Sequence, residues 1–197
     1  MTRRLKPIGR IARRAVICLW AIVIGSAISA YLISPTNFTA ANIAAFIERF
    51  QGAIWLVYFC LSAIRGITLL PSTPLVLAGT LLFPAHPWPV LIVSLIGIFL
   101  SSSMIYFGSE FLGFDEYFEA RKPVLVHRIR RRLEHPLGLL FVGAWAFFPL
   151  VPTDAVCYVA GTSRMNFPKF IAAVMAGEAL LCSIYIFSGG AALNYLH

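Results

Sequence analysis

One long run of the sequence, residues 66–109, contains no Asp, Glu, Lys or Arg. A soluble domain is usually about one quarter charged, whereas only 12% of the residues in this 197-residue chain are charged and 59% are hydrophobic. Such a run is typical of chain inside a bilayer, because a helix of about 20 apolar residues crosses the hydrocarbon core. The sequence therefore predicts one compact all-α integral membrane protein, which excludes an ordinary soluble enzyme.

The basic residues are concentrated in two places. Six of the 16 precede the first apolar segment, and six more lie in residues 121–132. Because clusters of Lys and Arg mark the cytoplasmic side of membrane segments, we expect a cytoplasmic N-terminus. The 121–132 loop acts either as a topology signal or as a surface for anionic headgroups. No nucleic acid is expected as a partner, since the clusters flank apolar stretches and lack interleaved aromatic residues.

The hydropathy pattern divides the chain into three parts. Residues 1–36 form a basic N-terminus with an uncharged anchor at 15–33, residues 37–190 a membrane domain, and residues 191–197 a C-terminal tail. The alternative for the first part is a signal peptide cleaved near residues 27–29. Within the second part we expect an amphipathic helix around residues 43–50 and full spans at 89–109 and 167–190.

Two further apolar segments, 52–64 and 137–148, are too short to cross a bilayer, and each runs into a proline cluster. The clusters PSTPLVLAGT (71–80) and PLVPTDAVCYVAGT (149–162) share a PxxP opening and an AGT ending. This pairing predicts opposed re-entrant hairpins at about 52–84 and 137–164, as in inverted-repeat transporters, with their broken tips facing each other. The alternative is two spanning helices that are merely kinked at the prolines.

The residues at the two breaks suit the ends of short helices. Thr73 before Pro74 is predicted to cap the first half-helix, and Thr153 or Asp154 the second. Glycines are predicted to end both half-helices. Free amides at such N-termini attract a phosphate. The candidate residues for a lipid phosphate are Arg65, Ser72, Thr73, Pro74, Gly79, Pro149, Pro152, Thr153 and Gly161.

Ionisable residues inside membrane segments are usually functional. We expect Asp154 to take up a proton as the phosphate arrives and to release it afterwards, and the alternative is that Asp154 only caps a helix. Glu178 is expected to pair with Arg65 or Arg164, or to bind a second proton. Glu110, near the cytoplasmic end of its helix, is the third candidate for proton coupling. Arg65 is expected either to attract the phosphate or to snorkel to the interface.

No cofactor, metal site or enzyme activity is expected. The histidines lack HExxH or i, i+4 spacing, and the four cysteines lie singly in apolar stretches. The chain also lacks a GxSxG elbow and a Walker sequence.

Several of these motifs resemble the VTT domain of the DedA superfamily, also called the SNARE-associated Golgi protein family, over roughly residues 50–190. The residues that carry the resemblance are Arg65, PSTP at 71–74, Gly79, YFG at 106–108, LG at 112–113, FPLVPTD at 148–154 and AG at 160–161. The resemblance implies opposed re-entrant hairpins and movement of lipids across the bilayer. It further implies polyprenyl phosphates such as undecaprenyl phosphate, or phospholipids, as substrates, and coupling to the proton-motive force in bacteria.

Two positions depart from the family pattern, because Ala146 and Glu110 stand where the family commonly has arginine. A mechanism that depends on those arginines therefore does not transfer. The sequence predicts a lipid translocase or scramblase, in a bacterial plasma membrane, that binds membrane lipids and protons. The alternatives are a proton-coupled carrier of a small anion and a structural membrane protein without transport.

Overall fold

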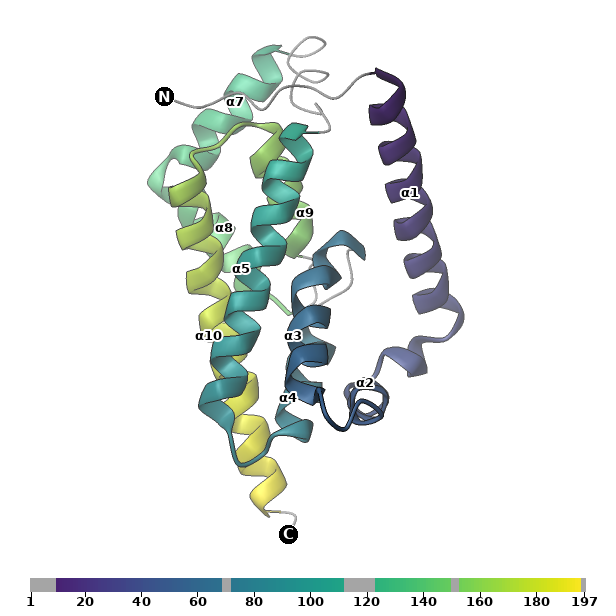
Figure 1. The fold of residues 1–197 in the computed structure, drawn as a ribbon. Helices are drawn as coiled ribbons and strands as arrows, with labels where there is room; N and C mark the ends of the chain where they lie inside the picture. The colour runs from purple at the N-terminus through teal and green to yellow at the C-terminus, as the bar shows by residue number, and fades with distance from the viewer. Residues whose placement is uncertain (1–9, 69–71, 112–122, 150–152, 196–197) are drawn as a thin grey trace.

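The computed structural model describes residues 10–68, 72–111, 123–149 and 153–195, and every element in those ranges is helical (Figure 1). The expected all-α fold is therefore confirmed. The elements are α1 (Arg10–Ile33), η1 (Pro35–Phe38), α2 (Ala40–Glu48), α3 (Ile54–Ile64), η2 (Arg65–Thr68), α4 (Thr73–Leu82), α5 (Pro87–Phe111), α7 (Pro123–Glu134), α8 (Pro136–Phe147), α9 (Thr153–Thr162) and α10 (Phe167–Tyr195).

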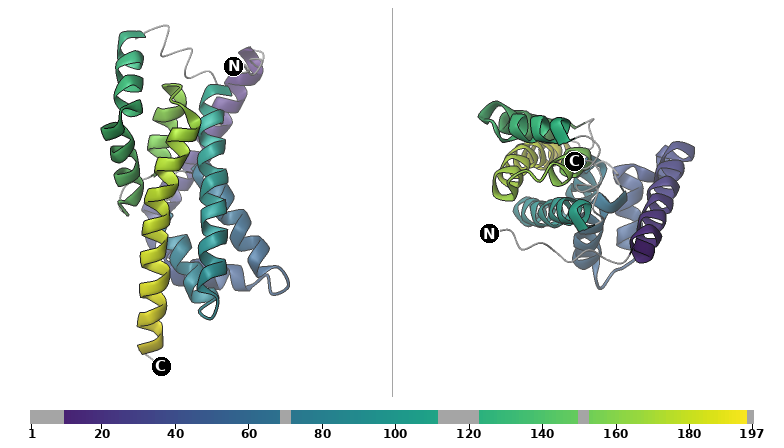
Figure 2. Two further views of the ribbon diagram at one scale, coloured as in Figure 1. Left: turned by 90° about the vertical axis from the view of Figure 1, so that its left-hand side faces the viewer. Right: turned by 90° about the horizontal axis from the view of Figure 1, so that it is seen from above.

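Two long helices, α5 and α10, lie side by side and extend through most of the molecule (Figures 1 and 2). Their segments Pro87–Ser109 and Phe167–Gly189 are long and apolar enough to cross a membrane. The two predicted spans are thus present as helices. The predicted anchor is likewise helical, as α1, and its insertion into a membrane stays a prediction.

Helices α5 and α10 carry apolar side chains on their exposed faces as well as on their buried faces. Large apolar side chains are exposed along both helices: Ile92, Ile96, Met104, Leu180 and Ile184. Among its buried apolar residues α5 also carries four buried serines: Ser94, Ser101, Ser102 and Ser109. Small residues let helices approach closely in lipid, where an apolar outer surface needs no covering. The distribution therefore fits a lipid-facing surface around a small-residue interior.

Four short helices surround α5 and α10: α3, α4 and α9 contact α5, and α8 packs on α10 (Figures 1 and 2). They form two consecutive pairs in the sequence, α3 with α4 and α8 with α9. Each pair consists of separate helices, since α3 passes into η2 before α4 begins and α8 ends at Phe147 before α9 begins at Thr153. Each apolar segment is thus interrupted near its proline cluster, and whether the two helices of a pair form a re-entrant hairpin stays a prediction. In α2, Thr39 accepts a hydrogen bond from the Asn42 amide, which caps the predicted amphipathic helix.

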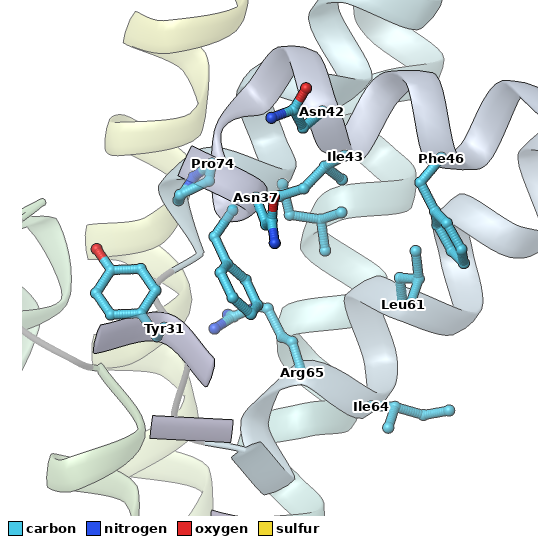
Figure 3. Close-up of a pocket in the computed structure, with 11 residues that line it drawn as sticks. Tyr31, Asn37, Asn42, Ile43, Phe46, Leu61, Ile64, Arg65 and Pro74 are labelled. Atoms are coloured by element: carbon cyan, nitrogen blue, oxygen red, sulfur yellow. The ribbon is translucent and has the colours of Figure 1, made fainter. Parts of the chain in front are cut away.

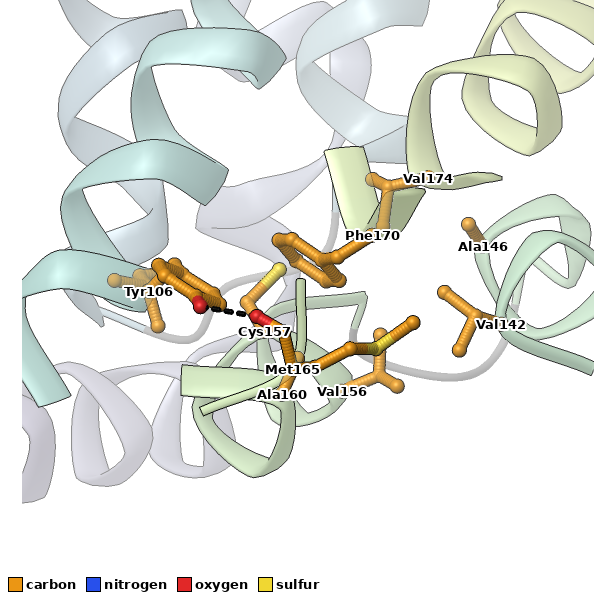
Figure 4. Close-up of a cluster of buried hydrophobic side chains, with 10 residues drawn as sticks. Tyr106, Val142, Ala146, Val156, Cys157, Ala160, Met165, Phe170 and Val174 are labelled. Atoms are coloured by element: carbon orange, nitrogen blue, oxygen red, sulfur yellow. Dashed lines mark hydrogen bonds between the residues drawn. The ribbon is translucent and has the colours of Figure 1, made fainter. Parts of the chain in front are cut away.

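The end of α9 belongs to a buried cluster between α5, α8 and α10 (Figure 4). Arg164 has a φ of 50°, and its amide donates to the Gly161 carbonyl, while the Met165 amide donates to the Ala160 carbonyl. This pair of bonds is a Schellman stop with a left-handed residue. The Tyr106 hydroxyl of α5 donates to the Met165 carbonyl and holds the turn in place.

Replacing Tyr106 with Phe is expected to lower the free energy of unfolding by about 1–3 kcal/mol, because the buried Met165 carbonyl would lose its donor. Tyr185→Phe is the matched control, since the described part of the chain contains no hydrogen bond from the Tyr185 hydroxyl. Denaturant unfolding in detergent measures both. Equal losses would show that the Tyr106 hydroxyl contributes nothing specific.

Candidate functional site

An ion pair joins the two helix breaks. Arg65 follows α3 directly, Asp154 is the second residue of α9, and Nη1 of Arg65 lies 3.6 Å from Oδ2 of Asp154. Their side chains are only 7% and 2% exposed. The end of α3 and the start of α9 are therefore brought together at these residues, and the facing of the two proline clusters stays a prediction. The snorkelling alternative for Arg65 is wrong, because the guanidinium is held inside by this carboxylate.

A second carboxylate lies beside the ion pair. Glu178 of α10 is fully buried, and its Oε1 accepts a hydrogen bond of 2.7 Å from the Thr153 hydroxyl. The expected ion pair of Glu178 with Arg65 or Arg164 is thus replaced by a hydrogen bond to α9, although the charge of Arg65 acts on both carboxylates. Three segments that are distant in the sequence therefore meet at one charged cluster.

Several polar atoms in this region are buried without a hydrogen-bond partner in the described structure. They are both carboxylate oxygens of Asp154, Oε2 of Glu178, Oγ1 of Thr73 and Oγ of Ser101. Because Asp154 accepts no backbone N–H, its role as a helix cap is wrong. Buried polar groups are nearly always hydrogen-bonded in proteins. The carboxylate oxygens among them therefore have unused capacity to accept a hydrogen bond or a proton.

Two glycines set the distance of the breaks from α5. A Cβ on Gly66 would meet the Ser101 hydroxyl and lie 2.9 Å from Ile105 Cδ1, so η2 rests directly on α5. A Cβ on Gly161 would lie 2.5 Å from the Tyr106 carbonyl oxygen, so α9 rests on the same helix. Helix α5 is thus the common surface that brings Arg65 to Asp154.

The predicted glycine stops are corrected by these contacts. Gly161 lies within α9, and Gly79 lies within α4 against the Tyr58 ring. Both positions allow close packing between helices, a tertiary requirement that the AGT motif alone does not reveal. Helix α4 continues to Leu82, and α9 stops through the Schellman bonds after Gly161.

The predicted caps are also corrected. Thr73 is the first residue of α4 and not its cap, since Ser72 occupies the N-cap position with helical backbone angles and no side-chain cap bond. Thr153 donates to Glu178, so its hydroxyl proton is directed to α10. Pro74 lies in the first turn of α4, and Pro149 lies just after α8.

Two predicted residues have no described side-chain position. Pro152 lies outside the described residues, and the side chain of Glu110, in the last turn of α5, is likewise not described. Ala146, where the family commonly has arginine, is fully buried in α8. A Cβ on Gly177 of α10 would lie 2.9 Å from the Ala146 Cβ, so this helix contact favours a small residue.

A cavity of about 370 Å³ lies on one side of Arg65 (Figure 3). Its lining residues are Tyr31, Asn37, Phe38, Asn42, Ile43, Phe46, Leu61, Ile64, Arg65, Pro74 and Leu75. Sequence reasoning missed this cavity and the buried Ser101, because both depend on how distant segments pack. The described residues contain no group of three or more His, Cys, Asp or Glu side chains suited to a metal ion.

Two long apolar helices with an apolar exposed surface, which enclose a buried arginine and two carboxylates, define a helical membrane protein with an internal charged site. Residues 70–191 match the VTT domain. The chain therefore belongs to the DedA/SNARE-associated Golgi protein family. No curated protein and no solved structure gives a significant match. Asp154 and Glu178 lie inside the matched region, whereas Arg65 and most of the cavity wall precede it.

Proposed function

We propose that this protein moves a lipid phosphate, either a polyprenyl phosphate or a phospholipid, across the bilayer by exchange at Arg65 and in response to the proton gradient. The observation that carries the proposal is the buried ion pair between Arg65 and Asp154 at the meeting point of the two breaks. A buried cation requires an anion beside it. Arg65 can satisfy that requirement with the carboxylate of Asp154 or with a lipid phosphate.

The need to balance the charge of Arg65 couples the exchange of Asp154 for a lipid phosphate to the binding of a proton. In one state ionised Asp154 neutralises Arg65. In the other state the phosphate occupies Arg65 and Asp154 is protonated, so the charge of Arg65 is balanced in both states. Neither carboxylate oxygen of Asp154 accepts a hydrogen bond in the described structure, so the Arg65 cation is the partner that favours its ionised form, and a phosphate that takes over Arg65 would release Asp154 to bind a proton. Glu178 is a candidate for a second proton, since its Oε2 is also without a partner.

In the proposal the lipid phosphate reaches this site in turn from the two membrane surfaces. The consecutive helix pairs α3–α4 and α8–α9 are joined by the ion pair between Arg65, which follows α3, and Asp154, in the first turn of α9. Backbone breaks at membrane depth are tolerated where protein or a wet cavity covers them. In the proposal both pairs are re-entrant hairpins, related as an inverted repeat, and enter from opposite sides. The protein then needs no ATP and no covalent chemistry.

The basic helix α7 gives the proposed orientation. Arg128, Arg131 and Arg132 are exposed on α7, which lies at the same end of the molecule as the beginning of α1 (Figure 1). Because basic residues favour the cytoplasmic side, we propose that this end of the molecule, with the N-terminus, faces the cytoplasm of a bacterium. There α7 can contact anionic headgroups.

A proton-coupled carrier of a small anion is the second candidate, favoured by the same Arg65–Asp154 pair. The cavity beside Arg65 distinguishes the two. Most of its lining side chains are apolar, which suits a hydrocarbon chain better than a hydrated solute. We therefore place the lipid phosphate first.

The proposal is tested in proteoliposomes with an imposed pH gradient and labelled polyprenyl phosphate or phospholipid. Wild type is expected to move one of these lipids faster with the gradient than without it. Asp154→Asn is expected to remove that acceleration, because an amide side chain does not take up or release a proton in this pH range.

Glu48→Gln is the control, since Glu48 is an exposed carboxylate at the end of α2. It should respond to the gradient as wild type does. A wild-type response in Asp154→Asn would contradict the coupling role of Asp154. No lipid movement above that of empty vesicles, together with gradient-dependent uptake of inorganic phosphate, would favour the small-anion carrier. Neither activity would favour a structural role.

A further inference from the structure

The cavity beside Arg65 is built from two parts of the chain. One wall comes from the end of α1 and from η1 and α2, and the other from the end of α3, Arg65 and the start of α4 (Figure 3). In Figure 3, Phe46 and Ile64 lie toward one side of the cavity and Tyr31 toward the other, with Arg65 between them. An apolar space thus reaches the buried arginine from the N-terminal segment.

The N-terminal wall is held by specific contacts. The Asn42 side-chain amide donates to the Thr36 carbonyl at 2.6 Å, and Thr39 caps α2. The rings of Tyr31 and Phe38 meet edge to face, with centroids 5.5 Å apart. Ile47 of α2 is fully buried against the cluster that contains Tyr58 and Leu75. These contacts join η1 and α2 to the rest of the protein, so the cavity has a built wall on this side.

The charge and the polarity of the lining define the ligand class. Arg65 is the charged residue of the lining and also the partner of Asp154. An anionic group that replaces Asp154 at Arg65 therefore has apolar space immediately beside it. The cavity volume of about 370 Å³ falls within the range of roughly 300–1,000 Å³ that ligand pockets usually have.

We infer that this cavity is a subsite for the hydrocarbon chain of a lipid phosphate, in which the chain segment nearest the phosphate lies between α2 and α3 while the phosphate contacts Arg65. The inference rests on the proposed function and deepens it. It makes residues 31–46, which precede the matched VTT region, a determinant of which chains the protein accepts. A larger side chain in the cavity wall should therefore weaken binding of lipids with long hydrocarbon chains. It should leave binding of the phosphate group at Arg65 unchanged.

The test measures binding of alkyl phosphates of increasing chain length to the full chain in phosphatidylcholine nanodiscs, with inorganic phosphate as the chainless probe. Ile43→Trp fills the cavity from α2. Ala45→Trp adds the same bulk at an exposed position of α2 that does not line the cavity. Wild type is expected to bind longer chains more tightly.

Ile43→Trp should weaken binding of the long-chain probe about tenfold, as expected when about two methylene groups are no longer buried. Binding of inorganic phosphate by that variant, and every value for Ala45→Trp, should stay within about twofold of wild type. Equal chain-length dependence in wild type and Ile43→Trp would overturn the inference, and so would an equal loss in Ala45→Trp.

A second measurement uses wild type alone, so it does not depend on how the variants fold. A photoreactive group placed on the alkyl chain near the phosphate is expected to label residues 31–46 or 61–65. Labelling confined to the exposed faces of α5 and α10 would overturn the inference.

The chain subsite and the proposed lipid transport can be refuted independently of each other. Chain-dependent binding without lipid movement in proteoliposomes would end the proposed function and leave the subsite in place. Normal lipid movement by Ile43→Trp, with an unchanged chain-length preference, would end the subsite and leave the proposed function in place.

Discussion

Replacing Arg65 with Met is expected to lower the free energy of unfolding by about 3–5 kcal/mol, the usual effect of removing one partner of a buried ion pair. The side chains of Arg65 and Asp154 are 7% and 2% exposed, so water cannot compensate for the lost cation. Asp154 would then be a buried carboxyl without its cation, next to Thr153, whose hydroxyl already donates to the second buried carboxylate, Glu178. Unfolding in detergent, followed by circular dichroism, measures the loss.

The double variant Arg65→Met with Asp154→Asn separates stability from function. Removal of both charges should restore most of the stability, because a buried pair replaced on both sides is often neutral. Lipid movement should stay absent, since no cation is left for the phosphate. Arg131→Met is the control, because Arg131 is exposed on α7, and its effect should stay within about 0.5 kcal/mol. A stable Arg65→Met variant that still moves lipid would refute both roles of Arg65.

Replacing Gly161 with Ala is expected to destabilise the protein by about 1–3 kcal/mol, the usual effect of extra bulk in a packed interior. The new Cβ would lie 2.5 Å from the Tyr106 carbonyl oxygen, a backbone atom of α5 that cannot rotate away. Helix α9 would have to move off α5, which carries Asp154 away from Arg65. Gradient-dependent lipid movement should therefore fall together with stability.

Gly108→Ala is the matched control, because it adds the same methyl group to α5 at a position with nothing within 4 Å. It should be neutral or stabilise by up to about 1 kcal/mol, since alanine favours the helix. Thermal unfolding of both variants in the same detergent gives the comparison. The same change in both would show that contact between α9 and α5 at Gly161 does not limit stability.

The sequence already contained the broad features of the fold. Hydropathy predicted the helices now seen as α5 and α10, and the proline clusters predicted the breaks before α4 and α9. These features are local, because the length of an apolar run and the missing amide of proline act on their own segment. The same reasoning selected Arg65, Asp154 and Glu178, since a charge inside an apolar segment stands out wherever it lies.

The hydrogen-bond partners of the site residues and the distances between helices depend on residues far apart in the sequence, and some of them were predicted wrongly. The Thr153 hydroxyl suits a helix cap by sequence, yet it donates to Glu178, which lies in another helix. Gly79 and Gly161 suit helix stops, yet they allow Tyr58 and the Tyr106 carbonyl to approach. A side chain's partner depends on which helices pack against it, and that packing is not encoded in any one motif.

The sequence by itself determined that this is a helical membrane protein with two interrupted segments and a few charges inside them, because composition and periodicity act residue by residue. Only the tertiary structure decided that Arg65 pairs with Asp154, that Glu178 joins them through Thr153, and that α2 closes a cavity beside the arginine. Those contacts arise where α5 brings separate segments together at the short distances that glycine and serine permit.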